Sequence, residues 1–297
     1  MPIAITGAIE LGLLYAIMAL GVYLTFRILD FPDLTVDGSF TTGAGIAAVL
    51  IVGGVSPALA TLAAFGGGLA AGAVTGLLHT KGKINALLSG ILMMIALYSI
   101  NLRIMGKANI SVYNLDTLLP EGSVLLIMPF VVLAIKLAVD WFLKTDVGLA
   151  LRATGDNARM IRSFGVHTDN TIILGVSLSN GLVAVSGALI AQYQFSADIQ
   201  MGVGMIVIGL ASVIIGEVIF GARSIVRATI AVVLGAIVYR LVVAMALQIG
   251  LNPTDMKLMT ALIVIIALIA PMLRKAVSQK RAGRRRIAEL ARKGEVR

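Results

Sequence analysis

The sequence predicts an all-α fold: a polytopic bundle of eight to ten transmembrane helices, one of them broken or re-entrant. Two observations support this fold class. Hydrophobic residues make up 59% of the 297 residues and charged residues only 13%, whereas soluble domains carry about a quarter charged residues. The apolar residues are also gathered into segments close to the length of about 20 residues that crosses a bilayer core. The chain therefore has room for one membrane domain and for no sizeable soluble domain.

Nine apolar segments follow one another, separated mostly by short turns that carry Gly, Pro or charged residues. They lie at residues 8–29, 39–55, 57–78, 84–104, 122–143, 170–194, 203–220, 227–248 and 257–273. We therefore expect a transmembrane domain over residues 1–273, with a cytoplasmic loop over 144–169. In the third segment, Gly68, Gly72 and Gly76 share one helical face, where they would let another helix approach closely.

Basic residues set the expected orientation of these helices. From residue 274 to residue 297 there are ten Lys or Arg and two Glu, a net +8 out of the formal +9 of the chain. The turns at 79–83 and 223–227 and the loop at 144–169 are also basic, and cytoplasmic loops carry an excess of Lys and Arg. We therefore expect 274–297 to be a basic tail that keeps the C-terminus in the cytoplasm; contact with the membrane surface or a partner is the alternative interpretation, and we expect no nucleic-acid binding.

A polar stretch stands at the start of the second apolar segment. Two carboxylates and four hydroxyls fall within ten residues, namely Asp33, Thr35, Asp37, Ser39, Thr41 and Thr42. Because unpaired polar groups are costly in lipid, these side chains should face protein or water. Either Asp37 or Ser39 caps a helix at the interface, or the stretch is a broken or re-entrant element that borders a translocation cavity.

The loop at 144–169 is expected to hold a short cytosolic helix. Residues 145–148 supply a turn and a cap, and residues 149–163 have helical composition apart from a Gly-Asp-Asn break at 155–157. A polar helix between two membrane spans can neither stay in lipid nor form a domain of its own. Its Arg side chains can pair with carboxylates of another protein. An ordinary basic loop would explain the Arg residues but not the ordered Gly-Asp-Asn arrangement.

This loop closely resembles the coupling loop of permease subunits of ATP-binding-cassette importers, of the branched-chain amino acid and ribose type. The matching residues are Gly148, Arg152, Ala153, Gly155, Asp156, Asn157, Arg159 and Gly165. The run from Asp33 to Val36 is similar to the Ile-Asp-Leu-Ser-Val-Gly stretch of ribose-type permeases, although Asp37 is inserted before Gly38. The Gly-rich segment at 202–221 also looks like a segment of that family.

The resemblance implies a transmembrane subunit that forms the pathway for a solute, with aromatic or branched-chain amino acids as the first expectation. It implies a cytoplasmic ATPase on the coupling loop, an extracytoplasmic solute-binding protein and a second permease chain, expected to be identical. ATP and Mg would lie in the ATPase, with no cofactor on this chain. The protein is then expected in a bacterial inner membrane, multi-pass, with a cytoplasmic C-terminus. Residues expected along the pathway are Asp33, Thr35, Asp37, Ser39, Thr41, Thr42, Ser177, Asn180, Gly202, Gly204 and Gly209.

No enzyme activity and no metal site are expected, because the chain has no Cys, two distant His and no phosphate-binding P-loop pattern. The alternative function is a self-sufficient secondary transporter or channel for a small polar solute. Such a protein would need its own coupling acid, for which Glu217 and Asp37 are candidates. Glu217 is expected to pair with Arg223 or Arg227, and Arg240 to reach toward the outer leaflet.

Overall fold

The computed structural model describes residues 2–119 and 124–248, together with residues 258, 260–262, 265 and 269. Its elements in chain order are α1 (Pro2–Val22), the π-helix η1 (Tyr23–Ile28), α2 (Thr35–Val52), α3 (Pro57–Thr80), α4 (Ala86–Met105), β1 (Asn109–Ser111), α5 (Val124–Phe142), α6 (Asp146–Ser163), α7 (Thr168–Tyr193), β2 (Ser196–Asp198), α8 (Met205–Phe220) and α9 (Ile225–Gln248). Strands β1 and β2 pair antiparallel. The prediction of an all-α bundle is confirmed.

The described helices include seven that are long and apolar enough to cross a membrane, when α1 and η1 are taken together. Helix α8 is apolar but has only 16 residues. These eight elements correspond one to one with the first eight apolar segments of the sequence. The ninth segment, at 257–273, lies largely outside the described residues, and the basic tail at 274–297 lies wholly outside them.

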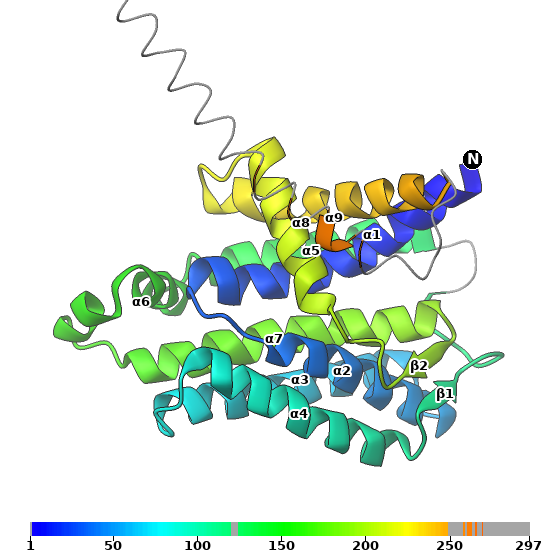
Figure 1. Cartoon of the computed structure of the whole chain (residues 1–297), viewed down its shortest axis with the longest axis horizontal. Helices are drawn as coiled ribbons and strands as arrows, with labels where there is room; N and C mark the ends of the chain where they lie inside the picture. Colours follow the sequence, from blue (N-terminus) through cyan, green and yellow to red (C-terminus); the bar gives the residue numbers. More distant parts are fainter. Residues whose placement is uncertain are drawn as a thin grey trace, which may run out of the picture.

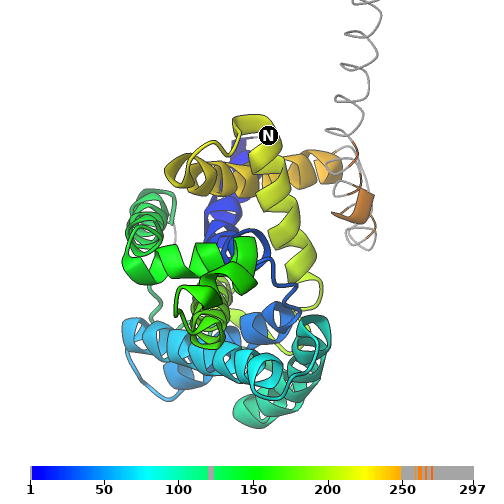
Figure 2. The same cartoon turned by 90° about the vertical axis from the view of Figure 1, so that its left-hand side faces the viewer.

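The long helices run side by side, with α6 at one end of the bundle and the β1–β2 pair at the other (Figure 1). The middle of α1, residues 14–20, is almost fully buried. It is surrounded by α5, α7, α8 and α9, all of which contact α1. Figure 2 is turned by 90° so that the α6 end faces the viewer, and it shows α6 lying across the front of the bundle. The polar helix therefore caps one end of an apolar core.

The glycine face of α3 packs directly on α7, as the spacing predicts. A Cβ atom on Gly68 would lie 2.3 Å from the carbonyl oxygen of Asn180, and one on Gly72 would lie 2.4 Å from that of Val176. At Gly76 the added atom would lie 2.7 Å from Cα of Ile173. Because real Cβ atoms do not come so close to backbone, these glycines allow the two helices to touch.

The chain is non-helical just before α2, between the first and the second apolar segment. Residues 35–42 form the regular start of α2, whereas residues 29–34 have no helical structure. Pro32 explains the break, because proline removes a backbone donor and disfavours helical geometry in the residue before it. In Figure 1 this linker leaves the α6 end and runs back into the bundle before α2 begins. Residues 29–34 are thus the connection between the first two apolar segments, and within the polar stretch at 33–42 only Asp33 and Leu34 are non-helical.

A second non-helical connection precedes α8. After β2 the chain passes through residues 199–204, and Gly204 adopts a φ of +88°, which glycine tolerates best. Figure 1 shows α8 starting within the bundle and running away from α2. Two helices thus begin inside the protein, and the backbone N–H groups of each first turn need acceptors from outside the helix.

Candidate pathway and coupling helix

A buried carboxylate joins three helices where α2 begins. Asp33 is 2% exposed, and its Oδ1 accepts the backbone N–H of Thr35 at 2.9 Å. Its Oδ2 accepts Nδ2 of Asn180 on α7 at 2.6 Å. The hydroxyl of Thr35 lies 2.8 Å from that of Thr75 on α3. Among the described residues no Lys or Arg forms an ion pair with Asp33, so N–H donors and the positive end of α2 stabilise this carboxylate.

A second carboxylate holds the start of α8. The two oxygens of Asp37 accept the backbone N–H groups of Gly204 and Ile206, each at 2.8 Å. A Cβ on Gly202 would lie 2.0 Å from the carbonyl oxygen of Asp37, so only glycine fits there. The Gly202 N–H also donates to the hydroxyl of Thr41 at 3.1 Å. Helices α2 and α8 are therefore joined by side chains and by close backbone contact.

A pocket of about 410 Å³ opens beside the α2–α8 junction. It is lined by Asp37, Gly38, Thr41, Met94, Ile95, Tyr98, Ser99, Asn101, Ile199 and Val203. Its volume falls within the usual range for sites that hold small molecules. A carboxylate, hydroxyls and an amide share its wall with Met, Ile and Val side chains. This arrangement suits a small solute that has both polar and apolar parts.

Several predicted pathway residues lie at helix contacts and not on this pocket. Ser177 donates to the carbonyl oxygen of Leu69 at 2.6 Å and thereby ties α7 to α3. Gly209 faces α1, where an added Cβ would lie 2.7 Å from a side-chain carbon of Val22. Thr42 donates to the carbonyl oxygen of Gly38 at 2.9 Å, inside the α2 helix. These residues hold the walls in place.

Of the predicted residues, the structure brings Asp37 and Thr41 to the pocket. Asn101, which is buried, donates to the carbonyl oxygen of Gly38 at 3.2 Å and lines the same pocket from α4. Tyr98, one helical turn away, is half exposed toward it. Sequence reasoning missed Tyr98, whereas Asn101, a polar residue in an apolar segment, could be noticed from the sequence but not assigned to the pathway. Ser39 is fully buried, and within the described part of the chain its hydroxyl has no partner.

Helix α6 is seated on the bundle by its small and apolar residues. The hydroxyl of Thr145 accepts the N–H of Gly148 and caps the helix. A Cβ on Gly148 would lie 2.1 Å from the carbonyl oxygen of Phe142, and one on Gly155 would lie 1.9 Å from that of Ile28. These two glycines, predicted as part of the coupling loop, therefore face inward. Their role is to let α6 lie against the ends of α5 and η1.

The opposite side of α6 faces away from the bundle. The predicted residues Asp156, Asn157 and Arg159 are exposed, while Arg152, Ala153 and Gly155 are half-buried. The helix kinks at Asn157, whose φ of −159° and ψ of 89° are not helical, as the Gly-Asp-Asn break predicts. Two large apolar side chains that sequence reasoning missed add to this surface, Met160 at 52% and Phe164 at 74% exposure. We call the exposed residues 156–164 the outer ridge of α6.

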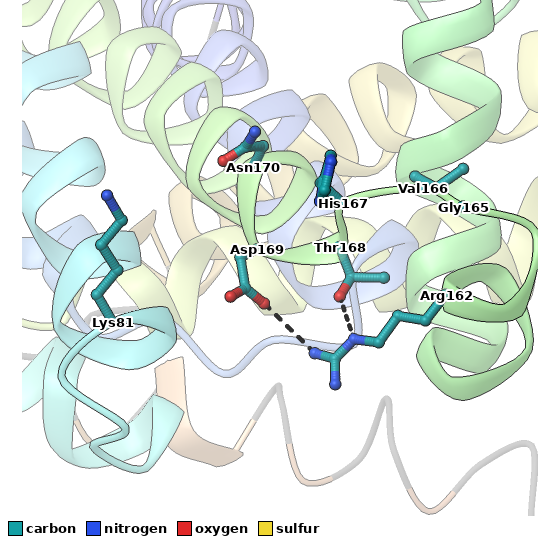
Figure 3. Close-up of a pocket in the computed structure, with 8 residues that line it drawn as sticks. All are labelled: Lys81, Arg162, Gly165, Val166, His167, Thr168, Asp169 and Asn170. Atoms are coloured by element: carbon teal, nitrogen blue, oxygen red, sulfur yellow. Dashed lines mark hydrogen bonds and ion pairs between the residues drawn. The ribbon is translucent and has the colours of Figure 1, made fainter.

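A second hollow, of about 520 Å³, lies between the end of α3 and the link from α6 to α7. Figure 3 shows the Arg162 side chain directed toward the start of α7, with Lys81 on the other side of the hollow. Nε of Arg162 donates to the hydroxyl of Thr168 at 2.5 Å, and its Nη2 donates to Asp169 at 3.3 Å. Arg162 thus fixes the angle between the two helices, and Gly165, with a φ of +85°, allows the turn.

Ion pairs within the bundle differ from the sequence expectation. Glu217 accepts Nε of Arg27 at 2.9 Å, and Arg227 donates to the carbonyl oxygen of Phe220 instead. The expected pairing of Glu217 with Arg223 or Arg227 is therefore wrong, because the fold brings the end of η1 beside the end of α8. The guanidinium of Arg240 lies 4.3 Å from the ring centre of Tyr15, a cation–π contact within the apolar core.

Sequence reasoning also missed a buried ion pair in α5. Lys136 and Asp140 are 5% and 4% exposed and pair with each other across one helical turn. Asp140 also accepts the hydroxyl of Thr229 on α9 at 2.6 Å. The spacing of four residues between opposite charges in an apolar segment was the available signal. Over the described residues, no group of three or more His, Asp and Glu side chains could hold a metal ion.

Several known proteins are similar to this chain. The model of the family described as "Branched-chain amino acid transport system / permease component" matches residues 4–269. The "Tyrosine transport system permease protein" of Clostridioides difficile (strain R20291) is 44% identical over 96% of each chain. A "Probable branched-chain amino acid transport permease protein LivH" of Methanocaldococcus jannaschii is 27% identical over 74% of each chain. A solved structure titled "An inward-facing conformation of a putative metal-chelate type ABC transporter" aligns with a TM-score of 0.49 at 20% identity, covering 93% of this chain and 85% of that one.

The family match covers most of the chain, and its first eight membrane segments are the helices described above. Components of this family typically leave ATP hydrolysis to a separate subunit. The described helices form a membrane bundle, as expected for the membrane subunit of such a transporter. The chain belongs to the family of branched-chain amino acid type permease components of ATP-binding-cassette transporters.

Proposed function

We propose that this chain forms the membrane pathway of an ATP-binding-cassette importer, and that α6 is the helix on which its ATPase docks. One observation carries the proposal: α6 is the polar helix of a membrane bundle, and its outer ridge is exposed while its inner face is fixed. The exposed ridge has charged members, Asp156 and Arg159, beside the apolar Met160 and Phe164. A surface of this kind can enter a cleft on a partner protein and pair with its charges.

The fixed inner face makes α6 suited to transmitting force. Gly148 and Gly155 bring its backbone into contact with α5 and η1. The hydroxyl of Thr154 lies 3.0 Å from that of Thr171 on α7. A helix held at three places would carry the motion of a docked ATPase into the bundle. In this proposal Gly148, Arg152, Ala153, Gly155 and Gly165 shape and seat the helix, whereas Asp156, Asn157 and Arg159 touch the ATPase.

The proposed pathway passes along the pocket of about 410 Å³ beside Asp37 and Thr41. Helices that begin inside a membrane are where transporters place polar contacts for their solutes. The remaining predicted residues, Asp33, Thr35, Ser39, Thr42, Ser177, Asn180, Gly202, Gly204 and Gly209, support its walls in this proposal. An amino acid is the proposed solute, because the pocket offers polar and apolar walls and the chain is similar to a tyrosine transport permease.

The proposed assembly contains two copies of this chain, two ATPase subunits that bind ATP and Mg, and an extracytoplasmic solute-binding protein. The chain would lie in the bacterial inner membrane with its α6 end, and its C-terminus, in the cytoplasm. Basic residues at the α6 end support this orientation, since Lys81, just after α3, and Arg162 of α6 line the same hollow there (Figure 3).

The test is ATP-dependent uptake by proteoliposomes that hold this chain with a candidate ATPase and a candidate solute-binding protein from the same organism. Radiolabelled tyrosine and leucine serve as solutes. We expect uptake that requires ATP and the binding protein, and we expect Arg159→Glu to weaken ATPase binding and uptake together. Lys107→Glu, an exposed charge next to β1, is the matched control and should transport normally. Uptake driven without any ATPase would refute the proposal and favour a self-sufficient transporter.

A further inference from the structure

The inner side of α6 contacts the chain where η1 ends and the linker at 29–34 begins. A Cβ on Gly155 would lie 1.9 Å from the carbonyl oxygen of Ile28 and 3.0 Å from Cα of Leu29. Ile28 is the last residue of the π-helix η1, and Leu29 opens the linker at 29–34. Besides its contacts with α5 and α7, the coupling helix therefore rests on the backbone where η1 ends and the linker begins.

Three elements meet around this contact. Gly175 of α7 has no room for a side chain, because an added Cβ would lie 2.5 Å from Cδ1 of Leu151 on α6 and 2.5 Å from Cδ1 of Leu29. Leu151 is fully buried and Leu29 is 7% exposed. We call Gly155, Ile28, Leu29, Leu151 and Gly175 the coupling junction. Gly155 meets Ile28 and Leu29 at backbone distance, so at this contact a displacement of α6 cannot be absorbed by side-chain rotation; Leu151 and Leu29 meet Gly175 through their side-chain ends.

The linker leads from the coupling junction to the pocket in a few residues. At its start, the N–H of Phe31 donates to the carbonyl oxygen of Thr25 at 2.9 Å, which ties the linker to η1. At its end, Asp33 is bonded to α2 and to α7. Four residues after Asp33, the side chain of Asp37 holds the N-terminus of α8 and lines the pocket.

The start of α8 must follow the start of α2. Asp37 accepts two N–H groups of the α8 N-terminus, and the backbone of Gly202 lies against that of Asp37. Thr41 accepts a further N–H from Gly202. A movement of the linker would therefore shift both polar walls of the pocket together. A π-helix is an uncommon turn, often found at functional sites, and η1 stands directly before this linker.

We propose that Gly155 and Leu29 are positioning residues for transport: they convert displacement of α6 into movement of the linker at 29–34, and thereby of the α2–α8 junction. This inference rests on the proposed function, in which α6 carries the ATPase. The segment that receives the motion is the break between α1 and α2. Neither residue touches the solute or the ATPase, since both face the interior of the bundle.

The first test is Gly155→Ala in the proteoliposome system, with ATPase binding, ATP hydrolysis and solute uptake measured side by side. The added methyl group must displace α6 from Ile28 but leaves the outer ridge unchanged. We expect ATPase binding and hydrolysis to be retained while uptake per ATP falls by roughly 5- to 150-fold, the range for coupling between two sites. Gly66→Ala is the matched control, because no atom lies within 4 Å of the added Cβ and uptake per ATP should not change.

A second variant changes the linker side of the coupling junction. Leu29→Ala removes the side chain that packs on Gly175 and does not alter α6 at all. We expect the same separation of hydrolysis from uptake, and Leu87→Ala, an exposed leucine of α4, should behave like the native protein. A merely structural role would lower ATPase binding, hydrolysis and uptake together and leave uptake per ATP unchanged. That proportional loss would overturn the proposal.

The motion itself can be followed with a thiol reporter, since the chain has no cysteine. Pro32→Cys places the reporter at an exposed position of the linker, and Tyr113→Cys places a control beside β1. We expect the labelling rate at position 32 to change with nucleotide in the native background and to become independent of nucleotide with Gly155→Ala. The rate at position 113 should not change in either background.

The outcomes separate the two proposals. If the native chain binds its ATPase and imports solute, but Gly155→Ala and Leu29→Ala keep a normal uptake per ATP, the positioning role fails and the proposed function stands. A nucleotide-independent rate at position 32 in the native complex would also overturn the positioning role. If the native chain neither binds an ATPase nor imports solute with ATP, both proposals fail.

Discussion

Because the ion pair between Lys136 and Asp140 is buried, the loss of folding free energy on removing one partner can be predicted. Both side chains are about 95% buried inside the bundle, and Thr229 of α9 donates to the same carboxylate. In Lys136→Met the Asp140 carboxylate keeps only that hydroxyl as a partner. Removing one member of a buried pair costs about 3–5 kcal/mol, because an uncompensated charge stays in an apolar interior. Replacing the pair by apolar residues of similar volume is often neutral or stabilising, by roughly 1–4 kcal/mol.

A double-mutant cycle in detergent tests this reasoning. We expect Lys136→Met to lower the free energy of unfolding by about 3–5 kcal/mol, and the joint variant Lys136→Met/Asp140→Leu to recover most of that loss. The measurement is the midpoint of denaturant unfolding, followed by the fluorescence of Trp141 and by retention of the monodisperse species. Lys107→Met, on an exposed lysine, should stay within about 0.5 kcal/mol of the native value. If Lys136→Met is as mild as this control, the pair is hydrated and the reasoning is wrong.

Three further predictions follow from other contacts. Gly72→Leu should separate α3 from α7 and abolish the monodisperse protein in size-exclusion chromatography, whereas Gly66→Leu should elute like the native chain. Asp37→Asn turns one of two acceptors for the α8 N-terminus into a donor, so it should destabilise the protein by about 1–3 kcal/mol and reduce uptake; unchanged unfolding would count against this cap. In intact cells, an impermeant thiol reagent should label Tyr113→Cys but not Lys81→Cys, and the reverse pattern would invert the orientation.

The helices could be predicted because their signal is local. An apolar segment of about 20 residues determines a membrane helix whatever surrounds it, and glycines at intervals of four fix which face packs closely. The kink in α6 was likewise readable, since Gly155-Asp156-Asn157 interrupts a helical run. The non-helical connection at 29–34 could also have been predicted, because Pro32 disfavours a helix at this position.

The contacts that build the pocket could not be read from the sequence, because their partners are far apart along the chain. Asp33 meets Asn180 across 147 residues, and Arg27 meets Glu217 across 190. Arg223 and Arg227 lie much closer to Glu217 in the sequence than Arg27 does, and for this reason the sequence-based pairing of Glu217 was wrong. Sequence patterns mark which residues are polar inside a membrane segment, whereas tertiary packing decides which of them face one another.

Asp33 and Asp37 each meet the N-terminus of a helix, and Asp37 also lines the pocket beside the α2–α8 junction. Asp33 accepts the first N–H of α2, and Asp37 accepts N–H groups of α8, a helix more than 160 residues away. The positive end of a helix offsets about half an elementary charge, so neither carboxylate depends on a Lys or Arg in the described part of the bundle. A wall built in this way offers oxygen atoms with little net charge. Such a wall suits the proposed passage of an amino acid, whose own charges cancel, and it would release the solute again because no strong ion pair has to be broken.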